Sequence, residues 1–163
     1  MKKKILSLTI GPVLVLGLIT IVLMLTMVKD SMIDEVQEAL KGTAAATLAA
    51  YDQNTGDYIE SSNGDIWKGS YNISKSESLV DRIKENSGMD VTFFYGDRRI
   101  MTSALDDNGE RILNSPAGER IVEKVLNGGE EYFSKAVSLE GELNYGYYMP
   151  VYQNCLLYTS PSP

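Results

Sequence analysis

The sequence predicts an α+β fold in which a long N-terminal helix precedes an antiparallel sheet with flanking helices. Three observations predict it: an uncharged apolar run at residues 5–28, later segments with apolar residues at helical spacing, and two strand–turn–strand patterns. Helical and hairpin patterns alternate along the chain, which is typical of an antiparallel sheet with helices on one side.

The first element is a helix long enough to cross a membrane. Residues 5–28 would span about 36 Å as a helix, against about 30 Å of hydrocarbon core. Three lysines precede the run, so residues 1–4 are expected in the cytoplasm and the chain from Lys29 onward outside. A cleaved signal peptide is the alternative, but its apolar core is only about 7–15 residues long. We therefore predict an uncleaved single-pass anchor in the inner or plasma membrane.

Residues 29–51 predict a membrane-proximal helix that continues out of the anchor. Apolar residues such as Met32, Val36 and Leu40 recur there at three- and four-residue steps. Residues 52–69 are rich in Asn, Gly, Ser and Asp, which predicts a loop with short strand pieces.

Two shorter helices are expected further along the chain. Residues 77–87 form an amphipathic pattern with Ser76 as the N-cap and Gly88 as the stop, and the residues expected to point inward are Leu79, Val80 and Ile83. Residues 117–126 show helical spacing again and end at Gly128 and Gly129.

Two hairpins give the strand signals. The first pairs residues 91–95 with 98–103, and the second pairs residues 132–139 with 143–149 across a turn at 140–141. Between them, residues 106–110 contain two aspartates but lack the ligand spacing of an EF-hand, so an ordinary solvated turn is expected.

The composition restricts the chemistry. The chain has no histidine, and its only cysteine is Cys155, which removes His- and Cys-based nucleophiles, zinc sites and thiol redox motifs. We expect no catalytic residue, metal or cofactor, and therefore no enzyme. Without the three N-terminal lysines, 12 Lys and Arg stand against 22 Asp and Glu, an acidic balance that disfavours nucleic acid as a partner.

The amino-acid composition changes abruptly after residue 154, and residues 155–163 look like the translation of a sequencing adapter. We expect them to be an artefact that is excluded from the fold, and the natural chain to be longer. A natural proline-rich tail is the alternative.

Several short pieces carry a resemblance to a known family. The most specific is Asp-Val-Thr-Phe-Phe-Tyr-Gly-Asp at residues 90–97, and the others lie at 54–58, 68–73, 99–103, 128–133 and 145–150. Together they resemble the single Cache domain of bacterial methyl-accepting chemotaxis proteins. The resemblance covers most of residues 52–154.

The resemblance implies a PAS-like extracytoplasmic sensor over residues 52–154 that binds a small molecule and signals across the membrane as a homodimer. It also implies a closing strand, a second membrane helix and a signalling region beyond residue 154. The sensor region of a histidine kinase or of a diguanylate cyclase is an alternative. A membrane-tethered surface module without signalling is another.

The candidate ligand is a small carboxylate or an amino acid. Arg99 with Thr102, both in one matched strand, are the leading contacts because a carboxylate suits a guanidinium fork with hydroxyl donors. Tyr95, Tyr145 and Tyr147 are expected as walls or donors. The alternative is that the tyrosines pack in the core and that Arg98 or Arg99 pairs with Asp97 at the surface.

Overall fold

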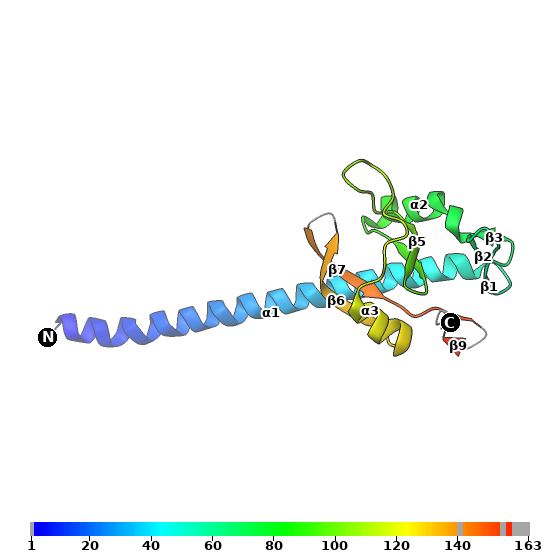
Figure 1. Ribbon diagram of the computed structural model, residues 1–163. Helices are drawn as coiled ribbons and strands as arrows, with labels where there is room; N and C mark the ends of the chain where they lie inside the picture. The colour runs from blue at the N-terminus through cyan, green and yellow to red at the C-terminus, as the bar shows by residue number, and fades with distance from the viewer. Residues whose placement is uncertain (1, 140–141, 154–155, 158–163) are drawn as a thin grey trace. The chain divides into compact units, whose positions relative to one another are not determined.

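The computed structural model describes residues 2–139, 142–153 and 156–157 (Figure 1). The predicted turn at 140–141 and most of the predicted adapter tail lie outside these residues. The chain divides into two units, Met1–Val36 and Gln37–Pro163, and each is considered by itself.

The first element is α1, a single α-helix over Lys2–Asp52 (Figure 1). The predicted continuation of the apolar run into the membrane-proximal segment is therefore confirmed. In the first unit the apolar side chains are exposed: Leu16 is 63 % and Leu25 is 65 % exposed. By length and composition α1 is able to cross a membrane, where lipid would cover these side chains.

A three-stranded antiparallel sheet follows α1, with β2 in the middle. Its strands are β1 (Tyr58–Glu60), β2 (Ile66–Lys68) and β3 (Tyr71–Asn72). The first two strands match the predicted strand pieces, and the third was not predicted. Lys75 closes a short 3₁₀ helix, η1 (Ile73–Lys75), that leads into α2.

Helix α2 (Glu77–Ser87) has the predicted bounds. Gly88 ends it in the left-handed conformation, with φ at 71°, as expected of a C-terminal glycine. Ser76 occupies the predicted N-cap position, but its side chain makes no capping hydrogen bond. The Ser76 hydroxyl instead bonds to the Tyr51 hydroxyl and the Ile73 carbonyl, both at 2.7 Å.

Both predicted hairpins are present (Figure 1). The first consists of β4 (Thr92–Tyr95) and β5 (Arg98–Thr102), and the second of β6 (Tyr132–Leu139) and β7 (Glu142–Tyr148). A final short pair joins β8 (Tyr152–Gln153) to β9 (Leu156–Leu157). Among the described residues the strands form separate antiparallel sheets, whereas one sheet was expected; the α+β class is confirmed.

The predicted helix at 117–126 is right in position but wrong in type. It begins as α3 (Glu119–Ile121) and continues as a π-helix, η2 (Val122–Asn127). The wider turn is closed by a 3.0 Å bond from the Gly128 N–H to the Glu123 carbonyl, five residues apart as in π geometry.

The core of the second unit lies between the end of α1 and the first hairpin. One buried cluster contains Tyr51, Tyr58, Ile66, Ile73 and Ile100. A smaller one contains Val80, Val91 and Met101. Phe93 of β4 packs against both clusters, so one face of the first hairpin is fixed in position by apolar burial.

Candidate ligand site

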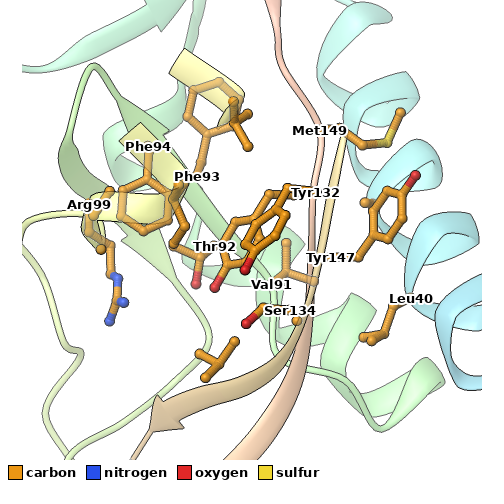
Figure 2. Close-up of a pocket in the computed structure, with 18 of the residues that line it drawn as sticks. Leu40, Val91, Thr92, Phe93, Phe94, Arg99, Tyr132, Ser134, Tyr147 and Met149 are labelled. Atoms are coloured by element: carbon orange, nitrogen blue, oxygen red, sulfur yellow. The ribbon is translucent and has the colours of Figure 1, made fainter. Parts of the chain in front are cut away.

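A cavity of about 1360 Å³ lies among α1, β4, the segment 116–126, β6 and β7. It is lined by residues on both sides of the second hairpin: Tyr147 lies on the same side as Leu40 of α1, while Thr92, Arg99 and Tyr132 lie on the other side (Figure 2). The two faces have different chemistry.

We call the face toward α1 the helix side. The ring of Phe93 lies edge-on to Tyr51 of α1 at 5.3 Å between centroids. The Tyr147 hydroxyl donates to the Glu131 carboxylate, which Lys41 of α1 also contacts at 2.9 Å. Because side chains alternate along a strand, the helix side consists of Phe93, Tyr95, Phe133, Tyr145 and Tyr147.

The opposite face, which we call the far side, holds the neighbours of those residues. Tyr132 and Tyr148 are cross-strand partners with rings stacked at 6.2 Å. The Arg99 guanidinium lies 5.4 Å above the ring of Phe94, its partner in the first hairpin. The far side consists of Thr92, Phe94, Arg99, Tyr132 and Tyr148.

Arg99 lines the cavity with unused hydrogen-bonding capacity. Its backbone N–H donates to Ser115 at 3.1 Å and its carbonyl accepts from Asn114 at 2.8 Å, so the residue is fixed in place. Its Nε is buried without a hydrogen-bond partner in the described structure. Burial lowers the pKa of Arg99, while the nearby Tyr148 opposes that shift; arginine still stays charged at neutral pH.

Among the described residues, neither Arg98 nor Arg99 forms the alternative ion pair with Asp97. Arg98 contacts Glu60 at 2.9 Å. Within the described part of the chain, Arg99 has no carboxylate partner at salt-bridge distance. Two consecutive arginines therefore have different surroundings, and only Arg99 offers its charge to the cavity.

Thr102 does not line the cavity. It is fully buried, and its hydroxyl lies 2.8 Å from that of Thr92, its cross-strand partner. Of this cross-strand pair, Thr92 lines the cavity. A contact between Thr102 and a ligand beside Arg99 stays a prediction.

The three predicted tyrosines line the cavity from the helix side, so the structure does not gather them around Arg99. Tyr95 packs against the Tyr51 cluster. Tyr145 stacks on Phe133 at 5.8 Å and is 42 % exposed. Burial, followed by the bond to Glu131, raises the pKa of Tyr147.

Tyr132 and Tyr148 were not predicted as site residues, although both line the cavity on the far side. Burial raises the pKa of Tyr148, and the Arg99 charge opposes the rise. Gly146 is the sequence feature that could have indicated this face. A Cβ at Gly146 would lie 3.2 Å from the Tyr148 ring and 2.6 Å from Val137, so a larger residue would collide with them. A glycine two residues before an aromatic residue leaves room for the ring to lie over the strand.

These features describe a small α+β sensor-type domain: antiparallel hairpins beside a long helix, with a fixed arginine in an aromatic cavity. The family model described as single cache domain 3 matches residues 71–155, more than half of the chain. The chain belongs to the single cache domain 3 family. Cache domains are extracellular sensor modules that bind small molecules. Searches of curated proteins and of solved structures gave no match.

Proposed function

We propose that this chain is the membrane-anchored, extracytoplasmic sensing region of a bacterial chemoreceptor of the methyl-accepting type. In this function the domain binds a small molecule and shifts between two arrangements, and no catalysed reaction is required. Membership of the Cache family supports the sensing role. The receptor type rests on the resemblance of residues 90–97 to chemotaxis receptors.

We propose a small carboxylate or an amino acid as the ligand. The observation that carries this is Arg99, a cation fixed by its backbone, with a buried free Nε and no carboxylate partner among the described residues. A guanidinium binds a carboxylate through two parallel hydrogen bonds. The Thr92 hydroxyl lines the same cavity and would add a donor.

The anchor gives the proposed topology. The apolar part of α1 would lie in the membrane with residues 1–4 in the cytoplasm, because lysines are retained on that side. The chain from Lys29 onward would then lie outside the cell, and α1 would bring two copies together as a homodimer. Protease treatment of intact cells should cut only the outer region, and protection of that region would contradict the topology.

A titration of the full chain in nanodiscs tests the ligand class. Calorimetry with acetate, propionate, butyrate, succinate and single amino acids should find at least one that binds. Arg99→Ala should weaken that binding by about 10- to 100-fold, because a charge-assisted hydrogen bond contributes about 1.5–3 kcal/mol.

The matched control is Arg98→Ala. This substitution removes the same charge one residue away, but Arg98 pairs with Glu60 at 2.9 Å and does not line the cavity. The affinity of Arg98→Ala for the ligand should stay near that of the unaltered protein. Equal affinities in Arg99→Ala and Arg98→Ala would remove Arg99 from the site.

A further inference from the structure

Residues 111–117 run back along the edge of β5 that does not pair with β4, and we call this segment the strap. The Asn114 N–H donates to the Arg99 carbonyl at 2.8 Å, and the Arg99 N–H donates to the Ser115 carbonyl at 3.1 Å. The last residue of the strap, Ala117, lines the cavity. The strap therefore satisfies both backbone groups of Arg99 and leads into the cavity wall.

The strap has two features that cost free energy. Asn114 has φ at 58°, in the left-handed region, and no other non-glycine residue in the described ranges has a positive φ. The Ser115 hydroxyl is buried without a hydrogen-bond partner in the described structure, and an unpaired buried polar group is unfavourable. A strap with these costs needs a further contact that holds it against β5.

The side chain of Arg111, at the start of the strap, makes that contact. Its Nη1 and Nη2 donate to the two carboxylate oxygens of Asp81 in α2, at 2.9 and 2.6 Å. Nη1 also donates to the Thr102 carbonyl of β5 at 2.7 Å. A guanidinium that binds a carboxylate through two parallel bonds is held strongly and in one orientation. One side chain therefore joins the strap to both α2 and β5.

We infer that Arg111 is a positioning residue for the ligand site, because it fixes the strap that holds the backbone of Arg99 at the cavity. This inference rests on the proposed function, since it concerns how the same site is assembled. Arg111 does not line the cavity, so it acts on a ligand only through the strap.

The first measurement needs no ligand. Amide hydrogen exchange of the full chain in nanodiscs, read by mass spectrometry, compares the unaltered protein with Arg111→Ala. Loss of a charge-assisted contact should raise exchange in peptides covering residues 98–102 and 111–117 by about tenfold or more. Exchange at residues 58–72 should stay the same, because local opening of the strap leaves the three-stranded sheet closed.

The second measurement is affinity for acetate, propionate, butyrate, succinate and single amino acids, by calorimetry. Arg111→Ala should weaken binding by about five- to tenfold, less than Arg99→Ala, because Arg99 keeps its charge but loses its fixed position. Arg111→Lys keeps the charge without the two-pronged geometry, so it should show most of this loss. Asp81→Asn removes the carboxylate and should resemble Arg111→Lys.

The matched control is Arg98→Ala. It removes another arginine–carboxylate pair, with Glu60 at 2.9 Å, from β5 itself. The Arg98 side chain is 38 % exposed, against 19 % for Arg111, and its loss leaves the backbone bonds of the strap in place. Neither the exchange of the strap nor the affinity should change in this variant. If Arg111→Ala does not fold, Arg111→Lys and Asp81→Asn decide the outcome.

The outcomes separate this inference from the proposed function. Unchanged exchange of the strap in both Arg111→Lys and Asp81→Asn overturns the inference. Faster exchange with unchanged affinity also overturns it, and it leaves the proposed function standing if Arg99→Ala still weakens binding. A protein that binds none of these acids and no amino acid overturns both.

Discussion

The two sides of the same strands differ in how their charges are matched. On the helix side, Lys41 and Glu131 form an ion pair that Tyr147 joins, and Phe93 closes the apolar core. On the far side, Arg99 lies over Phe94 without a carboxylate at salt-bridge distance in the described structure. Matched groups stabilise the packing of α1 on the strands, whereas unmatched groups remain available to a ligand. Strand alternation, together with the register shift between Phe93 and Phe94, separates the two roles.

The largest expected effect comes from neighbouring phenylalanines on opposite sides of β4. Phe93→Ala should destabilise the domain by about 2–3 kcal/mol, somewhat less than deletion of a fully buried phenylalanine, because its partly buried ring packs on Tyr51 and Tyr58 at 5.3 and 5.7 Å. Phe94→Ala should cost much less stability but weaken ligand binding, because Arg99 loses the ring beneath it.

Urea unfolding followed by the fluorescence of Trp67, the single tryptophan of the chain, measures both variants. The comparison of the two sides fails if Phe94→Ala is as destabilising as Phe93→Ala. It also fails if only Phe93→Ala alters the affinity of folded protein for its ligand.

The next effect is alkaline destabilisation through Tyr51, a fully buried residue on the helix side. Burial raises the pKa of Tyr51 from 10.0 to about 12, although the bond to Ser76 opposes the shift. A raised pKa means that the folded state favours the neutral phenol. The stabilisation is complete below pH 10 and is lost as the pH rises toward 12.

The loss should amount to about 2–3 kcal/mol across that window. Unfolding free energies measured between pH 9 and pH 12 should fall less steeply in Tyr51→Phe, whose ring cannot ionise. Parallel curves for the two proteins would show that the Tyr51 phenol is not shielded by the core.

Much of the fold could be predicted from sequence because its signals are local. Alternating residues and a Gly-Asp turn specify the first hairpin, and Gly88 specifies the end of α2. The π-helix could not be predicted, because the apolar residues of 121–126 follow α-helical spacing and only the backbone hydrogen bonds show the wider turn. Arg99 lines the cavity, as expected from its place in the matched strand, and its contact with a ligand stays a prediction.

The rest of the site depended on which face of each strand meets α1. Tyr147 and Tyr148 are neighbours on one strand and therefore point to opposite faces, with Tyr145 on the same face as Tyr147. Nothing in the local sequence decides which of the two faces meets the helix. That choice is made by long-range contacts such as Lys41 with Glu131, 90 residues apart.

The smallest expected effect is at Glu131. Glu131→Gln keeps an acceptor for Tyr147 but removes the charge facing Lys41, a pair whose side chains are 41 % and 44 % exposed. Exposed ion pairs contribute little and are screened by salt. Stability at neutral pH should therefore fall slightly, and added salt should reduce the difference from the unaltered protein. Ligand affinity should not change, since this contact is on the helix side.

The stability difference between the unaltered protein and Glu131→Gln should depend on pH. The bond from Tyr147 and then the contact with Lys41 lower the pKa of Glu131 from its usual 4.5. A lowered pKa contributes stability above that value, and the contribution is lost as the pH falls through the folded-state pKa. The advantage of the unaltered protein over Glu131→Gln should therefore disappear on acidification in a thermal unfolding series. A ligand affinity that follows Glu131 instead would show that the two sides of the strands do not act separately.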